Sequence, residues 1–386
     1  MQRVAQDWLV LQLTHGSGTA LGIATGLQFL PQLLFSLWGG MIADRYPKRN
    51  ILFVTQAVMG VLALILGTLA LTGVAAVWQV YLLAFALGMA AVVDNPARQT
   101  FAAEMVGTEG VANAIALNSA TFNLARIAGP AVAGLVISAV GTPAAFLLNA
   151  ASYGAVLVGL KLMRPAELHP VQRVPRARGQ LREALGYVKA RPDLLLTLTL
   201  VFFVATFGMN FQVTTALMSR GVFGTGAREF GFASAAFAVG ALAGALAAAR
   251  RARPGMRLLL ATSFVFGLLE VMTALMPTFW AFLAMLVPTG VALLMFTTTA
   301  NSTTQLSTAP AVRGRVMGLY MLVFLGGAPL GSPLVGWAAE QFGARMSLIA
   351  GGVISAAAAM AVALLLARAH GVPARSYLRP AARTAG

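Results

Sequence analysis

The segment GGMIADRYPKRN, residues 39–50, places four charged side chains within six positions between two apolar runs. The run before it is about twenty residues long, and ILFVTQAVMGVLALILGTLALTG follows it directly. A helix needs about 20 apolar residues to cross the ~30 Å hydrocarbon core of a bilayer. The segment is therefore predicted to be a short loop between two membrane helices, with its charges at the membrane surface.

The whole chain has the composition of a multi-pass membrane protein. Of its 386 residues, 59% are hydrophobic and 10% are charged, whereas soluble domains have about 25% charged residues. The chain contains no cysteine, which excludes disulfides and thiolate metal sites, and we expect no metal and no cofactor. Hydropathy predicts full spans at residues 20–43, 51–71, 77–93, 114–140, 143–162, 194–218, 230–249, 258–276, 279–300, 316–338 and 346–367.

The basic residues are distributed unequally between the two sides of these predicted spans. Of the 27 Lys and Arg residues, 22 fall on one side and three, Arg220, Arg228 and Arg345, on the other. The positive-inside rule describes this asymmetry, so the net charge of +16 indicates anionic lipid headgroups at the cytoplasmic face rather than nucleic acid. We expect a monomer in the inner (plasma) membrane, with its central linker and C-terminus in the cytoplasm.

The apolar stretch VAQDWLVLQLT, residues 4–14, is shorter than the others. Eleven helical residues cover about 16 Å, roughly half of the hydrocarbon core. Because the charge pattern places residues 15–19 outside, we interpret this stretch as the second half of a first helix whose beginning is missing.

Residues 164–192 form a long polar segment between two similar halves. LNSATFNLARIAGPAVAGLVISAVG (117–141) aligns with LYMLVFLGGAPLGSPLVGWAAEQFG (319–343), and LGIATG (21–26) aligns with FGFASA (230–235). Parallel repeats of six helices with a binding site at their interface are typical of transporters. We predict an all-α fold with an N-terminal bundle (1–163), a cytoplasmic linker (164–192) with a short amphipathic helix at 179–190, a C-terminal bundle (193–367) and a cytoplasmic tail (368–386).

GMIADRYPKR, residues 40–49, resembles the G-x-x-x-D-R-x-G-R-R loop between helices two and three of the major facilitator superfamily. DNPARQTFAAEMV (94–106) and NAIALNSATFNLARIAGPAVAGLVI (113–137) resemble its drug:proton antiporter-3 branch, which holds enterobactin-exporter and macrolide-efflux proteins. The resemblance implies bundles that rock around a cavity while proton entry drives export of a drug, macrolide or siderophore. Two departures are Pro47, where the family has glycine, and Ala84, where its R-x-x-Q-G motif has arginine.

The loop and the glycine-rich segments are predicted to control opening. Gly39 and Gly40 permit close packing of one helix on the other half, and Asp44 is placed to pair across that interface. The loop's basic residues are expected to anchor to lipid phosphates, and Asn95-Pro96 to break the fourth helix. Ordinary anchoring, a salt-bridged cap and simple glycine packing remain alternatives. The predicted gating and latch residues are Gly40, Asp44, Arg45, Lys48, Arg49, Asp94, Arg98, Gly129, Pro130, Gly134, Gly331, Pro333 and Gly336.

Polar side chains inside the spans are candidates for the substrate and proton pathway. Arg126 lies midway along a span, where a cation costs about 2.5–3.5 kcal/mol, so it should face an anionic substrate or a structural ion-pair partner. Asp7 is a candidate proton carrier, with a merely solvated carboxylate as the alternative. Glu270 is interpreted as a packed or lipid-exposed protonated acid, with a coupling site as the alternative. The predicted pathway residues are Asp7, Gln28, Asn118, Asn123, Arg126, Asn210 and Gln212.

An integral-membrane enzyme and a non-transporting sensor or scaffold are alternatives from other classes. An enzyme would need clustered reactive groups, yet the three histidines are far apart in sequence and no HxxxH pair, DxxxD pair or nucleotide-phosphate loop occurs. A channel fits the two-half repeat less well than a transporter does. The sequence therefore predicts a secondary transporter whose partners are a small molecule and protons.

Overall fold

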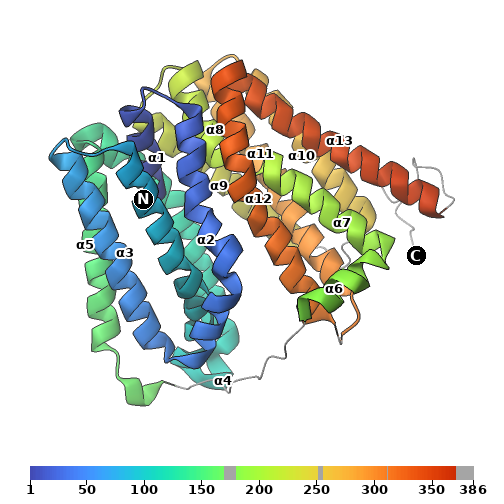
Figure 1. The fold of residues 1–386 in the computed structure, drawn as a ribbon, viewed down its shortest axis with the longest axis horizontal. Helices are drawn as coiled ribbons and strands as arrows, with labels where there is room; N and C mark the ends of the chain where they lie inside the picture. Colours follow the sequence, from blue (N-terminus) through green and yellow to red (C-terminus); the bar gives the residue numbers. More distant parts are fainter. Residues whose placement is uncertain (169–179, 251–254, 311, 371–386) are drawn as a thin grey trace. The chain divides into compact units, whose positions relative to one another are not determined.

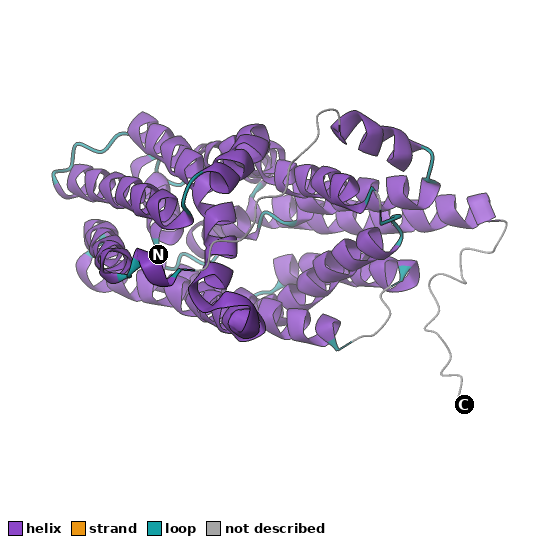
Figure 2. Cartoon of the chain, turned by 90° about the horizontal axis from the view of Figure 1, so that it is seen from below, coloured by secondary structure: helices purple, strands orange, loops and turns teal. Residues whose placement is uncertain are grey.

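The computed structural model describes residues 1–168, 180–250, 255–310 and 312–370, and within this part the chain folds into helices without any strand (Figures 1 and 2). A short 3₁₀ turn lies at Pro165–Glu167, and two π-helical segments, η2 and η3, lie at Val204–Gly208 and Met218–Val222. The α-helices are α1 (Gln2–Leu13), α2 (Gly18–Arg45), α3 (Lys48–Leu71), α4 (Val77–Val140), α5 (Thr142–Leu162), α6 (Gln180–Lys189), α7 (Pro192–Phe203), α8 (Phe211–Leu217), α9 (Ala227–Ala249), α10 (Met256–Leu275), α11 (Phe279–Leu306), α12 (Arg313–Phe342) and α13 (Ala344–His370).

The predicted spans correspond to helices of the structure. Ten described segments are long and apolar enough to cross a membrane, and α2 makes an eleventh if its two parts, which are bent by 64°, count as one span. Two of the ten, Val77–Val106 and Asn113–Val140, lie in α4. The prediction of an all-α, multi-pass membrane protein is confirmed.

The predicted helix break at Asn95-Pro96 is wrong. Helix α4 continues through both Pro96 and Pro130. A proline removes only one backbone donor, whereas breaking a helix inside a membrane would leave further backbone groups without partners. The Thr100 hydroxyl donates to the Pro96 carbonyl oxygen at 3.0 Å, one of the bonds within the helix that continues past the proline.

The chain divides into two compact units. Of the described residues, the first unit takes in 1–168, 212–238 and 328–344, and the second takes in 180–211, 239–327 and 345–370. The first unit buries Phe146, Phe230 and Leu21, and the second buries Phe266, Phe282 and Phe296. Boundaries between the units fall inside α9 and α12, so the division into bundles at 1–163 and 193–367 stays a prediction.

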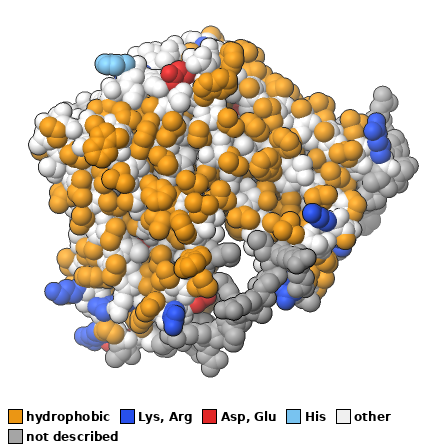
Figure 3. All heavy atoms as spheres, in the orientation of Figure 1, with side chains coloured by type: hydrophobic (Ala, Val, Ile, Leu, Met, Phe, Trp, Pro, Cys, Tyr) orange, Lys and Arg blue, Asp and Glu red, His pale blue; other side chains and the backbone are white. Residues whose placement is uncertain are grey.

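Apolar side chains cover much of the visible surface, while Lys and Arg gather at the ends of α2, α3 and α5 in the first unit (Figure 3). The exposed apolar residues include Val61 and Leu64 of α3 and Val158 of α5. Such contiguous apolar surface would be unfavourable in water and suits contact with lipid.

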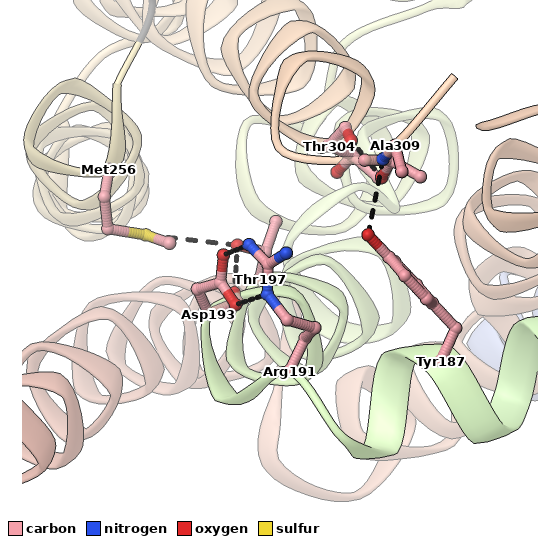
Figure 4. A network of polar contacts seen from close by, with 8 residues as sticks. Tyr187, Arg191, Asp193, Thr197, Met256, Thr304 and Ala309 are labelled. Carbon is pink, nitrogen blue, oxygen red and sulfur yellow. Dashed lines mark hydrogen bonds and ion pairs between the residues drawn. The ribbon is translucent and has the colours of Figure 1, made fainter. Parts of the chain in front are cut away.

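Helix α6 confirms the short helix predicted in the linker, and the second unit anchors it (Figure 4). The Tyr187 hydroxyl accepts from the Ala309 N–H at 3.3 Å. Arg191 donates twice to Asp193, at 2.8 and 3.1 Å, at the start of α7. These contacts hold α6 and the residues after it to the start of α7 and to the segment that follows α11.

Candidate functional site

Helix α1 binds its neighbours in the first unit through a series of polar side chains. Gln2 and Gln6 are four residues apart and therefore lie on one face. The spacing could have identified Gln6, which the sequence analysis missed. Gln2 bonds to Asn149 of α5 at 2.9 Å, and Gln12 bonds to Thr142 of α5 at 2.8 Å. Gln6 bonds to Gln28 of α2 at 3.4 Å, and Asp7 bonds to Gln212 of α8 at 2.5 Å.

Asp7 is buried, with 1% of its surface exposed. Its Oδ2 accepts from Gln212, while its Oδ1 has no hydrogen-bond partner among the described residues. The Arg3 guanidinium stacks on the Phe29 ring, 4.7 Å from the ring centre. The alternative of a solvated Asp7 is wrong. A buried carboxylate with a free oxygen is costly when ionised and can take a proton.

Arg126 is exposed, midway along the second part of α4. Within the described residues it makes no ion pair and no hydrogen bond, so the structural ion-pair alternative fails there. Asn123 donates to the Ser119 carbonyl oxygen of its own helix at 2.8 Å, and Asn118 is exposed. Asn210, in the second unit, donates to the Thr206 carbonyl oxygen at 2.7 Å across the break after η2.

A dense polar cluster joins α3 to α4, and we call it the Asp94 cluster. Asp94 is 2% exposed and accepts from Thr55 and Gln56 at 2.7 Å each. Arg98 donates to its other oxygen at 2.6 and 3.0 Å. The carboxylate is thus fully bonded, in contrast to Asp7. Thr55 and Gln56 were not predicted, because they look like ordinary members of an apolar span.

The basic residues of the α2–α3 loop bind protein groups. Lys48 pairs with Glu104 of α4 at 2.6 Å, and both side chains are mostly buried. Arg49 donates to the Leu160 carbonyl oxygen at 2.8 Å, at the carboxyl end of α5. The expectation that these two residues anchor to lipid phosphates is therefore corrected. Asp44 and Arg45 are exposed at the end of α2, and their latch role stays a prediction.

Two helix pairs in the first unit that join the first half of the sequence to the second half approach closely enough for their backbones to touch. A Cβ added at Gly22 of α2 would overlap the Ser332 carbonyl oxygen of α12, and one at Gly336 would overlap the Gly18 carbonyl oxygen. We call this contact the α2–α12 seam. The Glu340 carboxylate closes it by accepting from the Ser17 hydroxyl at 2.7 Å and from the Thr19 N–H at 2.8 Å. Pro333 packs on Gly26 within the same seam.

The second contact, the α4–α9 seam, is built in the same way. A Cβ at Gly134 would lie 2.6 Å from the Ala227 carbonyl oxygen, and one at Gly231 would lie 2.5 Å from the Pro130 carbonyl oxygen. The sequence repeat aligns Gly134 with Gly336 and Gly231 with Gly22. The two seams are therefore equivalent contacts related by the repeat.

Gly39 and Gly129 take different positions. Gly39 points at the Val92 carbonyl oxygen of α4, in its own half of the sequence, which corrects the expected packing on the other half. Gly129 has only the Met1 backbone nitrogen near its Cβ direction, at 3.6 Å. The gating roles of Gly40 and Gly331 stay predictions.

A cavity of about 270 Å³ opens between α11 and α12 in the second unit. The rings of Tyr320 and Phe324 stack there, with 6.0 Å between their centres. The volume is slightly below the usual range for whole ligands, so the cavity could hold one ring system of a larger molecule. It is lined by Thr297, Thr298, Asn301, Ser302, Tyr320, Met321 and Phe324.

The family model described as transmembrane secretion effector (MFS_3) matches residues 1–379. The chain belongs to this family of the major facilitator superfamily. The resemblance seen in residues 40–49 and 94–137 is thereby confirmed. The protein is a multi-pass membrane transporter, and the enzyme alternative is excluded.

Curated relatives of this transporter cover nearly its whole length. The Staphyloferrin A transporter of Staphylococcus aureus is 25% identical over 88% of this chain and 86% of its own. The multidrug efflux pump Tap of Mycolicibacterium fortuitum is 27% identical, covering 90% and 87% of the two chains. The enterobactin exporter EntS of Shigella flexneri is 26% identical, covering 94% and 86%.

Solved structures share the fold of the transporter. The nucleoside transporter NupG aligns with a TM-score of 0.71 at 14% identity, over 94% of this chain and 96% of its own. A bacterial homologue of the human lysosomal transporter Spinster aligns with a TM-score of 0.69 at 17% identity, over 95% and 94%.

Replacing Asp94 with alanine should destabilise the transporter. The change leaves the buried Thr55 and Gln56 donors without their acceptor, which costs about 1–3 kcal/mol per group. We expect a clearly lower melting temperature of the purified protein in detergent. Glu167→Ala serves as the control, because its ion pair with Arg164 is exposed and such pairs contribute about 0–1 kcal/mol. Equal melting temperatures for the two variants would contradict the structural role of Asp94.

Filling the α2–α12 seam should prevent its closure. Leucine at Gly22 would collide with the Ser332 backbone, and such overpacking costs about 1–3 kcal/mol. Because the chain has no cysteine, Ser17→Cys and Glu340→Cys provide a specific cross-link across the seam.

We expect Gly22→Leu to slow this cross-linking and to reduce transport, both measured in membranes. Gly159→Leu is the matched control, because nothing lies within 4 Å of its Cβ direction. Normal cross-linking and transport in Gly22→Leu would show that the seam does not need close backbone contact.

Proposed function

We propose that this transporter exports a small molecule by alternating access, driven by proton entry. The equivalence of the α2–α12 and α4–α9 seams carries the proposal. Each seam joins a helix of the first half of the sequence to a helix of the second through glycine contacts. In close packing of this kind no long side chain has to change its rotamer when the two helices separate, and the helices can pack again with the same geometry.

Polar contacts within the first half of the sequence have a different role from the seams. The Asp94 cluster and the Lys48–Glu104 pair join α3 to α4. Both helices belong to the first half of the sequence, so these bonds keep that half rigid while the seams separate. Movement of rigid halves about a midplane site is the general mode of such repeats.

Asp7 is the proposed proton carrier. It is buried, one of its oxygens is unpartnered, and Gln212 from the second half of the sequence donates to the other. Protonation would weaken a bond to a charged acceptor, so proton binding and the contact between sequence halves are physically linked. Gln28, through Gln6, orients the same segment of α1.

The substrate is proposed to be a siderophore or a drug. Relatives carry the names Staphyloferrin A transporter, multidrug efflux pump and enterobactin exporter. Arg126 offers an exposed cation within a span, which suits an anionic group. The stacked Tyr320 and Phe324 rings suit an aromatic one. Asn118, Asn123 and Asn210 remain secondary candidates.

We also propose an orientation for the transporter in the inner membrane. The basic loops, the linker and the C-terminus would face the cytoplasm and contact anionic headgroups, and the protein would act as a monomer. The charge asymmetry of the loops supports this orientation.

The proposal is tested by uptake into inverted membrane vesicles, with and without a protonophore. Radiolabelled enterobactin and a macrolide are suitable probes. We expect respiration-driven accumulation of a probe that the protonophore abolishes. Accumulation that survives the protonophore would reject proton coupling. Accumulation in right-side-out vesicles alone would reject export.

Asp7→Asn should abolish gradient-driven accumulation while substrate exchange across the membrane continues. Asparagine keeps the shape and the hydrogen bond from Gln212 but cannot take up and release a proton. Exchange is measured as counterflow in proteoliposomes. Asp193→Asn is the control, because that carboxylate is partly exposed and paired with Arg191 at the start of α7. Unimpaired accumulation in Asp7→Asn would remove Asp7 from the coupling mechanism.

Arg126→Ala should weaken binding of an anionic substrate. A hydrogen bond to a charged group contributes about 1.5–3 kcal/mol, which is roughly a 10- to 150-fold change in the dissociation constant. Binding is measured by calorimetry on the purified transporter, with Arg126→Lys retaining part of the affinity. Equal affinities for wild type and Arg126→Ala would show that the guanidinium does not contact the substrate.

A further inference from the structure

Glu270 lies inside α10 of the second unit and is 1% exposed. Of the two interpretations made from the sequence, the packed acid agrees with this burial and the lipid-exposed acid is wrong. Its Oε2 has no hydrogen-bond partner among the described residues. A buried acid of this kind, in a helix that the transport mechanism does not otherwise use, needs a physical explanation.

Two glycines from other segments make room for the Glu270 carboxyl. A Cβ at Gly351 of α13 would lie 2.9 Å from Oε1, and one at Gly208 of η2 would lie 3.3 Å from Oε2. The first distance is shorter than Cβ contacts allow, and the same Cβ would lie 2.7 Å from the Phe207 carbonyl oxygen, so a side chain at Gly351 would displace both the acid and the η2 backbone. Ser355 also lies beside Gly208, since its Oγ would be 2.6 Å from a Cβ added at Gly208. The carboxyl therefore occupies a fitted niche.

The niche borders a break in a membrane helix. Helix α7 ends at Phe203, η2 continues to Gly208, and α8 begins at Phe211. Single-turn π-helical segments occur frequently at functional sites, and unwound segments of membrane helices are where transporters bind protons and ions. The break gives the segment beside Glu270 a means of moving without unfolding a regular helix.

No described cation neutralises Glu270, since none of the ion pairs involves it. The described residues of η2 and α11, which pack against α10, contain no titratable residue. Asp193 and Arg257 lie at the starts of α7 and α10. Arg345 of α13 donates to the Ala274 carbonyl oxygen at 2.8 Å, one turn beyond the acid. An unpaired carboxylate in such a place would be very costly.

We propose that Glu270 is a second proton-binding site, separate from Asp7, which exchanges its proton when the η2 break rearranges. Its ligand is a proton held on a neutral carboxylic acid. The role in transport rests on the proposed proton coupling, but occupancy of the site by a proton does not.

Infrared difference spectroscopy of the purified transporter tests the occupancy directly. We expect the carbonyl stretch of a protonated carboxylic acid at neutral pH, lost in Glu270→Gln and retained in Asp7→Asn. Gly351→Ala should shift this band by crowding Oε1, whereas Gly154→Ala, with nothing within 4 Å of its Cβ direction, should not. If Glu270→Gln removes no protonated-acid band, the proposal is overturned. An ionised Glu270 that binds sodium would give this result.

Transport stoichiometry in proteoliposomes separates this inference from the proposed function. We expect Glu270→Gln to carry fewer protons per substrate molecule while it still accumulates substrate. If Glu270→Gln keeps the wild-type stoichiometry, the second site has no role in transport, although Asp7-dependent coupling can still hold. If no variant and no wild type accumulates substrate, the proposed function fails, and the spectroscopic result still decides whether Glu270 binds a proton.

Discussion

Hydrocarbon supplies no hydrogen bonds, and this constraint governs both the fold and the placement of polar side chains. It explains why α4 stays helical through Pro96 and Pro130. It also explains why many buried polar residues are bonded to other helices. The bonds from α1 to α2, α5 and α8 are the clearest case, because they hold a short helix in place within the first unit.

The same constraint separates the buried acids into two kinds. Asp94 accepts four hydrogen bonds, two of them from its ion-pair partner Arg98, so both of its oxygens are bonded. Asp7 and Glu270 each keep an oxygen without a partner among the described residues. An acid that is fully bonded contributes to rigidity, whereas an acid that is left unsatisfied is suited to gaining and losing a proton. The two proposed proton-binding sites are therefore the two buried acids whose hydrogen bonding is incomplete.

The sequence predicted the spans and the matching glycines because hydrophobic length and repeat spacing are local properties. It did not predict Glu104 as the partner of Lys48, since the two residues are far apart and no pattern links them. The burial of Glu270 depends on Gly208 and Gly351, which come from distant segments. The error at Pro96 arose because a local rule for proline was applied where the membrane opposes it.

The two halves share their seams but differ in their charges. The repeat offset that aligns Gly134 with Gly336 places Asp94 opposite Phe296 and Arg98 opposite Ala300. Phe296 and Ala300 are buried in the second unit, so apolar packing occupies the positions that correspond to the Asp94 cluster. Polar bonds that resist bending lie in one half, and the π-helical break lies in the other. Under the proposed alternating access, this difference suits the first half of the sequence to moving as a block and the second half to changing its internal shape.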